Sequence, residues 1–285
     1  MRRPAAAGLL CLALILLGAA PAAAAPTWLA PVDLSLPGKN ARDPRVAVDD
    51  AGGMVAIWER EGATPFQNTV QASIRSPGGA FSAPLDLSLP SQDPTLVMTP
   101  GGEAVVLWWH FQNPNYTLEA STRPPGGSFS PPVVVQSLPV GVFPTAIQAA
   151  INPSGALVVA WINRAEAELT EEQEEEEVNP DVNVVEASVR PAGGSFSEPE
   201  VVSPQPFEPG KNTSGPSVAI DPAGNSIVVM TYNDGDDVLI EAAIRPPGGG
   251  FQSPVTISEP GEDAFEPDIA VDAAGNAMAV WERFD

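Results

Sequence analysis

The sequence predicts an all-β protein, a β-propeller of four-stranded blades, and three observations support this fold class. Glycine (25 residues) and proline (33 residues) are abundant and long helical patterns are absent, which is typical of short strands joined by many turns. A unit of about 50 residues recurs along the chain. A turn-like heptapeptide recurs within it: RSPGGAF from Arg75, RPPGGSF from Arg123, RPAGGSF from Arg190 and RPPGGGF from Arg245.

The repeat is measured by five equivalent glycines, Gly52, Gly102, Gly155, Gly224 and Gly275, which are separated by 50, 53, 69 and 51 residues. One repeat is therefore expanded, and its insertion follows Trp161. The predicted blades cover residues 43–92, 93–139, 140–203 and 215–258, with a partial blade at 266–285. A row of β-sandwich domains is the competing fold, but it requires alternate repeats to differ systematically, and they do not.

Each complete repeat contains four strand patterns, called a to d here. Strand a alternates after an x-Pro step, at Pro44, Pro94, Pro144, Pro216 and Pro267. Strand b is almost continuously apolar, as in MVAIW and AVVLW, so both of its faces should be covered. Strands c and d alternate again, as in VQASIR and LDLSL. Four strands in about 50 residues is the signature of a propeller blade.

The amino-terminal residues predict export. Arg2 and Arg3 precede an apolar run and a small-residue region, so residues 1–24 read as a signal peptide, which leaves a mature chain of 25–285 without the single cysteine, Cys11. Residues 26–37 resemble an isolated strand d that would complete the partial blade. Either the ring closes with five blades, the last one three-stranded, or the chain is a fragment of a longer array; we favour the fragment because Asp285 falls in mid-repeat.

The order of antiparallel strands assigns the loops to two faces. The a–b and c–d turns share one face, and the b–c and d–a loops, which carry the length variation, share the other. We therefore expect the repeated arginines to be structural, and the turn residues Asp49, Asp221 and Asp272 to cap their own turns. Any binding site should lie on the variable face.

Two groups on the variable face are candidate sites. Aromatic side chains beside polar groups commonly bind ligands, and five of them form a candidate patch: Phe66, Trp109, Phe111, Tyr116 and Tyr232. Asp234, Asp236 and Asp237 are the best candidates for binding Ca²⁺, although a solvated hairpin tip also explains them. We expect no other cofactor.

The charge limits the partners. The formal net charge is −23, and −25 without Arg2 and Arg3, which repels phosphate backbones and anionic membrane surfaces. Nucleic acid is therefore excluded as a partner, and the mature chain is expected to have no membrane span. A carbohydrate or an extracellular protein remains the expected partner.

The motifs VDxxGNxxxVW and RPPGGxF resemble those of secreted bacterial β-propeller repeat proteins, loosely similar to the sialidase-like superfamily. The resemblance implies a propeller, but no residue here matches a catalytic residue of sialidases. The sequence thus favours a secreted, non-enzymatic protein that binds a carbohydrate, polymer or protein through its variable face. A sialidase-like glycoside hydrolase and a structural fragment without a site are the alternatives. Glu59 and Glu282 invite the hydrolase reading but occupy equivalent places in their repeats, which counts against it.

Overall fold

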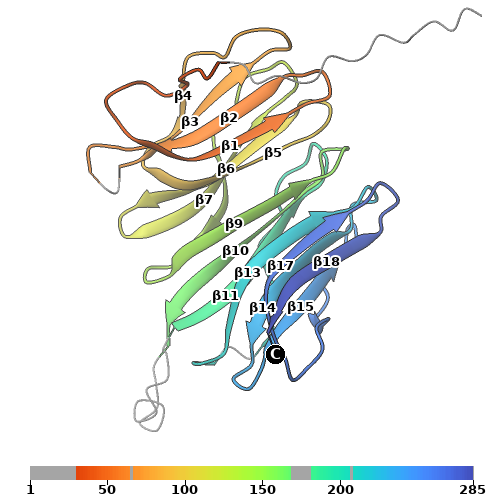
Figure 1. Ribbon diagram of the computed structural model, residues 1–285. Coiled ribbons are helices and arrows are strands. Elements are labelled where there is room, and N and C mark those ends of the chain that lie inside the picture. The colour runs from red at the N-terminus through yellow and green to blue at the C-terminus, as the bar shows by residue number, and fades with distance from the viewer. Residues whose placement is uncertain (1–29, 65–66, 168–180, 206–207, 285) are drawn as a thin grey trace, which may run out of the picture. The chain divides into compact units, whose positions relative to one another are not determined.

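The computed structural model describes residues 30–64, 67–167, 181–205 and 208–284. Its regular structure there consists of antiparallel strands alone (Figure 1). Within these ranges no helix is long and apolar enough to cross a membrane. Residues Leu34–Asp285 form one compact unit, separate from residues Met1–Asp33, and the unit is described by itself below.

The strands form five sheets that follow one another along the chain. The first sheet contains β1 (Ala41–Val48), β2 (Met54–Arg60), β3 (Thr69–Arg75) and β4 (Leu85–Ser88). The second contains β5 (Ser91–Met98), β6 (Ala104–Gln112), β7 (Asn115–Arg123) and β8 (Val133–Ser137). The third contains β9 (Phe143–Ile151), β10 (Leu157–Glu166), β11 (Asp181–Arg190) and β12 (Glu200–Val201).

The fourth sheet contains β13 (Asn212–Ile220), β14 (Ser226–Asn233), β15 (Val238–Arg245) and β16 (Val255–Thr256). The fifth has two described strands, β17 (Asp263–Val271) and β18 (Ala277–Phe284). Four complete blades, each in the order a-b-c-d, and a partial blade with strands a and b confirm the predicted propeller fold. Of the predicted strand at residues 26–37, residues 26–29 lie outside the described residues and 30–37 form no strand.

The turns follow the predicted chemistry. The first glycine of each c–d turn has a left-handed backbone, with φ of +69° at Gly78 and +67° at Gly126, which a residue with a Cβ adopts only at a cost. Asp49 and Asp221 cap their a–b turns by accepting the N–H of Gly53 (2.7 Å) and Asn225 (2.8 Å). Asp272 does the same for Asn276 (2.8 Å), so the capping prediction is confirmed.

The core lies between successive sheets, because alternate residues of the central strand b point to opposite neighbours. Val55 and Ile57 of β2 pack against Ala104, Val106 and Trp108 of β6. Val105 and Leu107, the intervening residues of β6, pack in turn against Leu157, Val159 and Trp161 of β10. We call the face of a sheet that meets the preceding sheet its front face, and the face that meets the following sheet its back face.

Every strand a contains an irregular residue near its start. The pairing register shifts between Arg42 and Arg45 in β1, and the same shift recurs in the other four sheets. The residue within each bulge has a positive φ, and the set is Asp43, Asp93, Ala146, Gly215 and Glu266. In the third sheet this residue is followed by Ile147, so the assignment of Pro144 as the equivalent of Pro44 is wrong by three residues.

Candidate functional site

A buried carboxylate joins the first two sheets on the variable face. Glu59, near the end of β2, is 1% exposed and accepts four hydrogen bonds. The guanidinium of Arg42 donates from Nε (2.9 Å) and Nη2 (2.5 Å), and Asn68 donates from Nδ2 (2.6 Å). The backbone N–H of Asp93, at the start of the second sheet, donates the fourth (3.2 Å). Charge-assisted bonds of this number compensate for the burial of the charge.

Two further carboxylates flank Glu59. Asp43 and Asp93 occupy the equivalent bulge positions of β1 and β5, and both have φ of 51°. Left-handed backbone at a residue other than glycine costs of order 1–3 kcal/mol, and because the bulge recurs in every sheet it is a feature of the blade. Each aspartate is followed by a proline, which fixes the chain direction after the bulge.

The pKa of the Asp93 carboxyl is perturbed by its surroundings. Burial raises its pKa, and the negative charges of Glu59 and Asp43 raise it further, while Arg42 opposes this rise. The side chain of Asp93 is nevertheless accessible to solvent. An accessible carboxyl that holds its proton above the usual pH range, beside other carboxylates, is suited to give a proton to a bound substrate.

An aromatic group lies where the second and third sheets meet. Phe111 and Tyr116 face each other across the β6–β7 hairpin with ring centroids 4.8 Å apart, and Phe143 packs edge-on against Tyr116 at 6.3 Å. Burial and the charge of Asp93 raise the pKa of the Tyr116 hydroxyl, which places Tyr116 near the carboxylates. Phe143 is 56% exposed, so this group of Phe111, Tyr116 and Phe143 offers an aromatic surface to a ligand.

The structure brings together two members of the predicted aromatic patch. Phe111 and Tyr116 are in contact, whereas Tyr232 lies in the fourth sheet, paired with Thr213. Trp109 is fully buried and packs edge-on against Trp161 at 6.3 Å, so its placement on the surface was wrong. The strand β6 continues to Gln112, which keeps Trp109 on the back face among the core residues. Phe66 lies outside the described residues.

The acidic hairpin after β14 uses its carboxylate locally. Oδ1 of Asp234 accepts the backbone N–H groups of Asp236 (2.9 Å) and Asp237 (2.8 Å), and these bonds lower the pKa of Asp234. Such an arrangement is a self-capped turn. In the described ranges no three His, Cys, Asp or Glu side chains are grouped so as to hold a metal ion.

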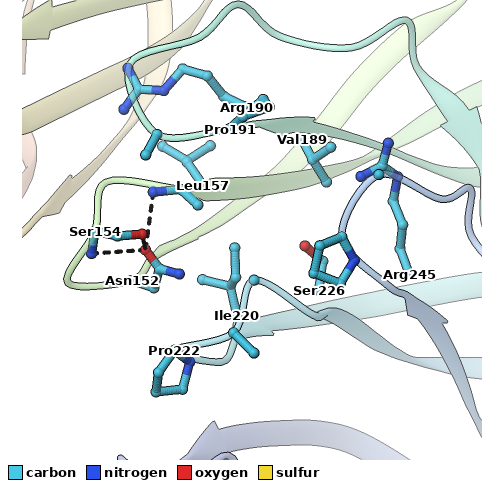
Figure 2. A pocket seen from close by; sticks show the side chains of 16 residues that line it. Asn152, Ser154, Leu157, Val189, Arg190, Pro191, Ile220, Pro222, Ser226 and Arg245 are labelled. Atoms are coloured by element: carbon cyan, nitrogen blue, oxygen red, sulfur yellow. Dashed lines mark hydrogen bonds between the residues drawn. The ribbon is translucent and has the colours of Figure 1, made fainter.

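The opposite face holds a cavity of about 190 Å³ between the third and fourth sheets (Figure 2). Its walls are a–b turns, such as Asn152 and Pro222, and c–d turns that carry Arg190 and Arg245. Both arginines are already paired, Arg190 with Glu103 (2.5 Å) and Arg245 with Glu200 (3.1 Å). These contacts support the structural role predicted for the repeated arginines and leave little free charge for a ligand.

Sequence reasoning missed Asp43, Asp93 and Phe143. The signal for the aspartates is the Asp-Pro step in ARDPRV and SQDPTL, which by itself predicts only the start of a strand. Glu59 was set aside because Glu282 is its equivalent. The corresponding residues of the second, third and fourth sheets are Trp109, Ile162 and Thr231, so the glutamate is not a property of every blade.

Comparisons with known proteins were made at the level of sequence and of structure. No protein-family model and no curated protein sequence matches the chain. Among solved structures, an ulvan lyase from a new family of polysaccharide lyases has 12% sequence identity to this chain and a TM-score of 0.53. The match covers 84% of this chain and 66% of the lyase chain.

Two arabinan-degrading enzymes are similar at a lower level. The α-L-arabinanase of Penicillium chrysogenum, solved with arabinobiose, has 11% identity and a TM-score of 0.49, and the match covers 84% of this chain and 74% of the other. The endo-arabinase of Bacteroides thetaiotaomicron has 15% identity and a TM-score of 0.40, with coverage of 84% and 88%. At these identities the similarity to the lyase supports the fold only.

The expectation of a non-enzymatic protein is wrong. It rested on the view that groups copied into the blades are structural, and on the lack of sialidase residues. A polysaccharide lyase shares this fold, so the repeated blades give no ground for excluding an enzyme. The bulge itself recurs in every sheet, but the group of Glu59, Asp43 and Asp93 in the first two sheets does not belong to the repeated turn chemistry on which that expectation was based.

Proposed function

We propose that the protein is a carbohydrate-cleaving enzyme of the glycoside hydrolase type, with Asp93 as its general acid and Asp43 as the second carboxylate. The observation that carries this proposal is the grouping of the accessible Asp93 carboxyl with Asp43 and the buried Glu59 where the first two sheets meet, in which burial and the charges of Glu59 and Asp43 raise the pKa of Asp93. Glycoside hydrolysis requires one carboxyl that protonates the leaving oxygen and another that acts as base or nucleophile. Where the surroundings give neighbouring carboxyl groups different pKa values, the carboxyl with the higher pKa serves as the acid.

Glu59 acts through its neighbours in this proposal. Its carboxylate is buried and occupied by Arg42, Asn68 and the backbone of Asp93, so it does not reach a substrate. It fixes the position of the Asp93 backbone and adds the negative charge that helps Asp93 to keep its proton. Glu59 is therefore a positioning residue.

The aromatic group supplies the binding surface. Sugar rings present apolar faces bordered by hydroxyl groups, and exposed aromatic rings beside polar groups bind such faces. Phe143 is exposed and packs against the half-buried Tyr116, whose pKa is raised by burial and by the charge of Asp93. Secretion, as predicted from residues 1–24, would bring the protein into contact with extracellular polysaccharides.

A polysaccharide lyase is the second candidate, favoured by the similarity of fold to the ulvan lyase. A lyase needs a base that removes a proton from the sugar ring. Tyr116 is the nearest tyrosine to the carboxylates, but its raised pKa keeps its hydroxyl protonated and makes it a poor base. The hydrolase reading therefore fits the geometry better.

The test is a panel of purified polysaccharides, including arabinan and ulvan, incubated with the mature chain. Hydrolysis releases reducing ends without new ultraviolet absorbance, whereas elimination by a lyase also creates an absorbing unsaturated sugar. We expect reducing ends alone from at least one substrate, and their loss with the Asp93→Asn variant. Turnover that survives this substitution, or elimination products, would contradict the assignment.

A further inference from the structure

The first and fifth sheets each expose one apolar face. The corresponding faces of the sheets between them pack against a neighbouring sheet. On the front face of the first sheet, Val46 is 66% exposed and Val48 is 54% exposed. On the back face of the fifth sheet, Met278 is 71% exposed and Val280 is 57% exposed. Exposed apolar groups in adjacent positions of a strand are typical of an interaction surface.

The internal junctions show which surface each face fits. Leu96 and Met98 occupy the places of Val46 and Val48 in the second sheet, and they pack into the cluster between the first two sheets. Val55 and Ile57 occupy the places of Met278 and Val280 in the first sheet, and are 1% and 0% exposed there. The exposed faces thus carry the two complementary halves of a junction that the chain already forms.

The polar groups of the two faces match in the same way. Glu282 of β18 occupies the place of Glu59, and Asp43 occupies the place of Asp93. Between the first two sheets this pair is bonded, since Oε2 of Glu59 accepts the N–H of Asp93. The second, third and fourth sheets have no glutamate at this place. Glu282 and Asp43 are both exposed, so each is available to a partner.

We propose that the back face of the fifth sheet binds the front face of the first sheet of a second copy of this chain. The contact repeats the junction between the first two sheets, with Met278 and Val280 packed on Val46 and Val48. Such an interface is heterologous, because two different surfaces meet. The contact includes Asp43, the second carboxylate of the activity proposed above, but its test measures association and needs no enzymatic activity.

The experiment is sedimentation velocity over a range of concentrations with the chain of residues 25–285 and two variants. Val46→Lys blocks the front face of the first sheet, and Val280→Asp blocks the back face of the fifth. Both residues are exposed, so circular dichroism should show an unchanged fold. Val255→Lys is the matched control, since Val255 is 58% exposed but lies on β16, away from both faces.

We expect the unsubstituted chain and the Val255→Lys control to associate with rising concentration, and each of the other two variants to remain monomeric alone. Mixing these two variants should give a one-to-one dimer and nothing larger, because the mixture retains one intact face of each kind. An unsubstituted chain that is monomeric at every concentration would overturn the proposal. So would a mixture that does not pair, or association that persists in both variants.

Discussion

The backbone N–H of Asp93 donates a hydrogen bond to Oε2 of Glu59 across the junction of the first two sheets, at 3.2 Å. This contact connects a buried carboxylate in the core of one blade to a strained residue at the start of the next. It holds Asp93 where burial and the charges of Glu59 and Asp43 raise its pKa. Packing between blades and the chemistry of the proposed site therefore depend on the same side chain.

The Glu59→Gln substitution should destabilise the fold. A neutral amide keeps one acceptor oxygen but loses the charge that compensates Arg42 and strengthens the hydrogen bonds that Glu59 accepts. Hydrogen bonds to charged groups each contribute about 1.5–3 kcal/mol, so we expect a loss of about 2 kcal/mol in the free energy of unfolding. Chemical denaturation measures this loss.

Glu282→Gln is the matched control for Glu59→Gln, because Glu282 has the same place in the repeat and is exposed. At a concentration at which the chain is monomeric, its effect should stay within about 0.5 kcal/mol. Equal effects of the two substitutions would show that the contacts of Glu59 do not stabilise the junction.

Glu241→Gln should stabilise the protein at neutral pH. Burial raises the pKa of Glu241 in the folded state, so the folded chain binds this proton more tightly than the unfolded chain does. The resulting penalty is absent below the unfolded pKa, develops as pH rises towards the folded pKa, and is complete above it. We expect a higher Tm for the variant near pH 7.5, and little difference below about pH 4.

The first sheet offers a natural precedent for this change, because Gln71 stands where Glu241 stands in the fourth sheet. Glu119→Gln in the second sheet is the control, since Glu119 accepts the indole N–H of Trp108 (3.1 Å). The gain should be confined to Glu241→Gln. A Tm that falls at neutral pH would mean that the bond from Thr256 to Glu241 outweighs the cost of burial.

Tyr116→Ala should weaken substrate binding more than it slows the chemical step. Removing the ring takes away the aromatic surface beside Asp93, and a loss of about 1.4 kcal/mol of binding raises KM about tenfold. Tyr116→Phe, which keeps the ring, should bind almost normally. Tyr232→Ala in the fourth sheet is the control, and an equal effect there would remove the aromatic group from the site.

The repeat predicted the architecture well because the same pattern of strands and turns recurs in each blade. The glycine spacing, the apolar strand b and the heptapeptide determine four-stranded units, and the turn caps at Asp49, Asp221 and Asp272 followed from side-chain chemistry alone. The repeat pattern does not show where each strand ends. Trp109 looked like the start of a loop, but β6 runs on to Gln112 and buries it.

The candidate site could not be read from the sequence for a physical reason. Asp43 and Asp93 lie 50 residues apart in the chain and act on each other only because their bulges meet at one junction. A positive φ at an aspartate before proline is a property of the folded strand pair. Phe143 was likewise a strand start in the sequence, and only packing against Tyr116 placed it in the aromatic group.

The most direct test of the proposed activity uses a polysaccharide that the chain hydrolyses. It compares the pH dependence of kcat/KM for the chain and for its Asp93→Asn variant. Asp93 must be protonated to act as an acid, and its raised pKa should place the fall of activity at a pH above the ordinary range of an aspartate. We predict that Asp93→Asn lowers kcat/KM by about 10²–10⁴-fold and abolishes this fall. Unchanged kcat/KM, or the same fall of activity in the variant, would contradict the assignment.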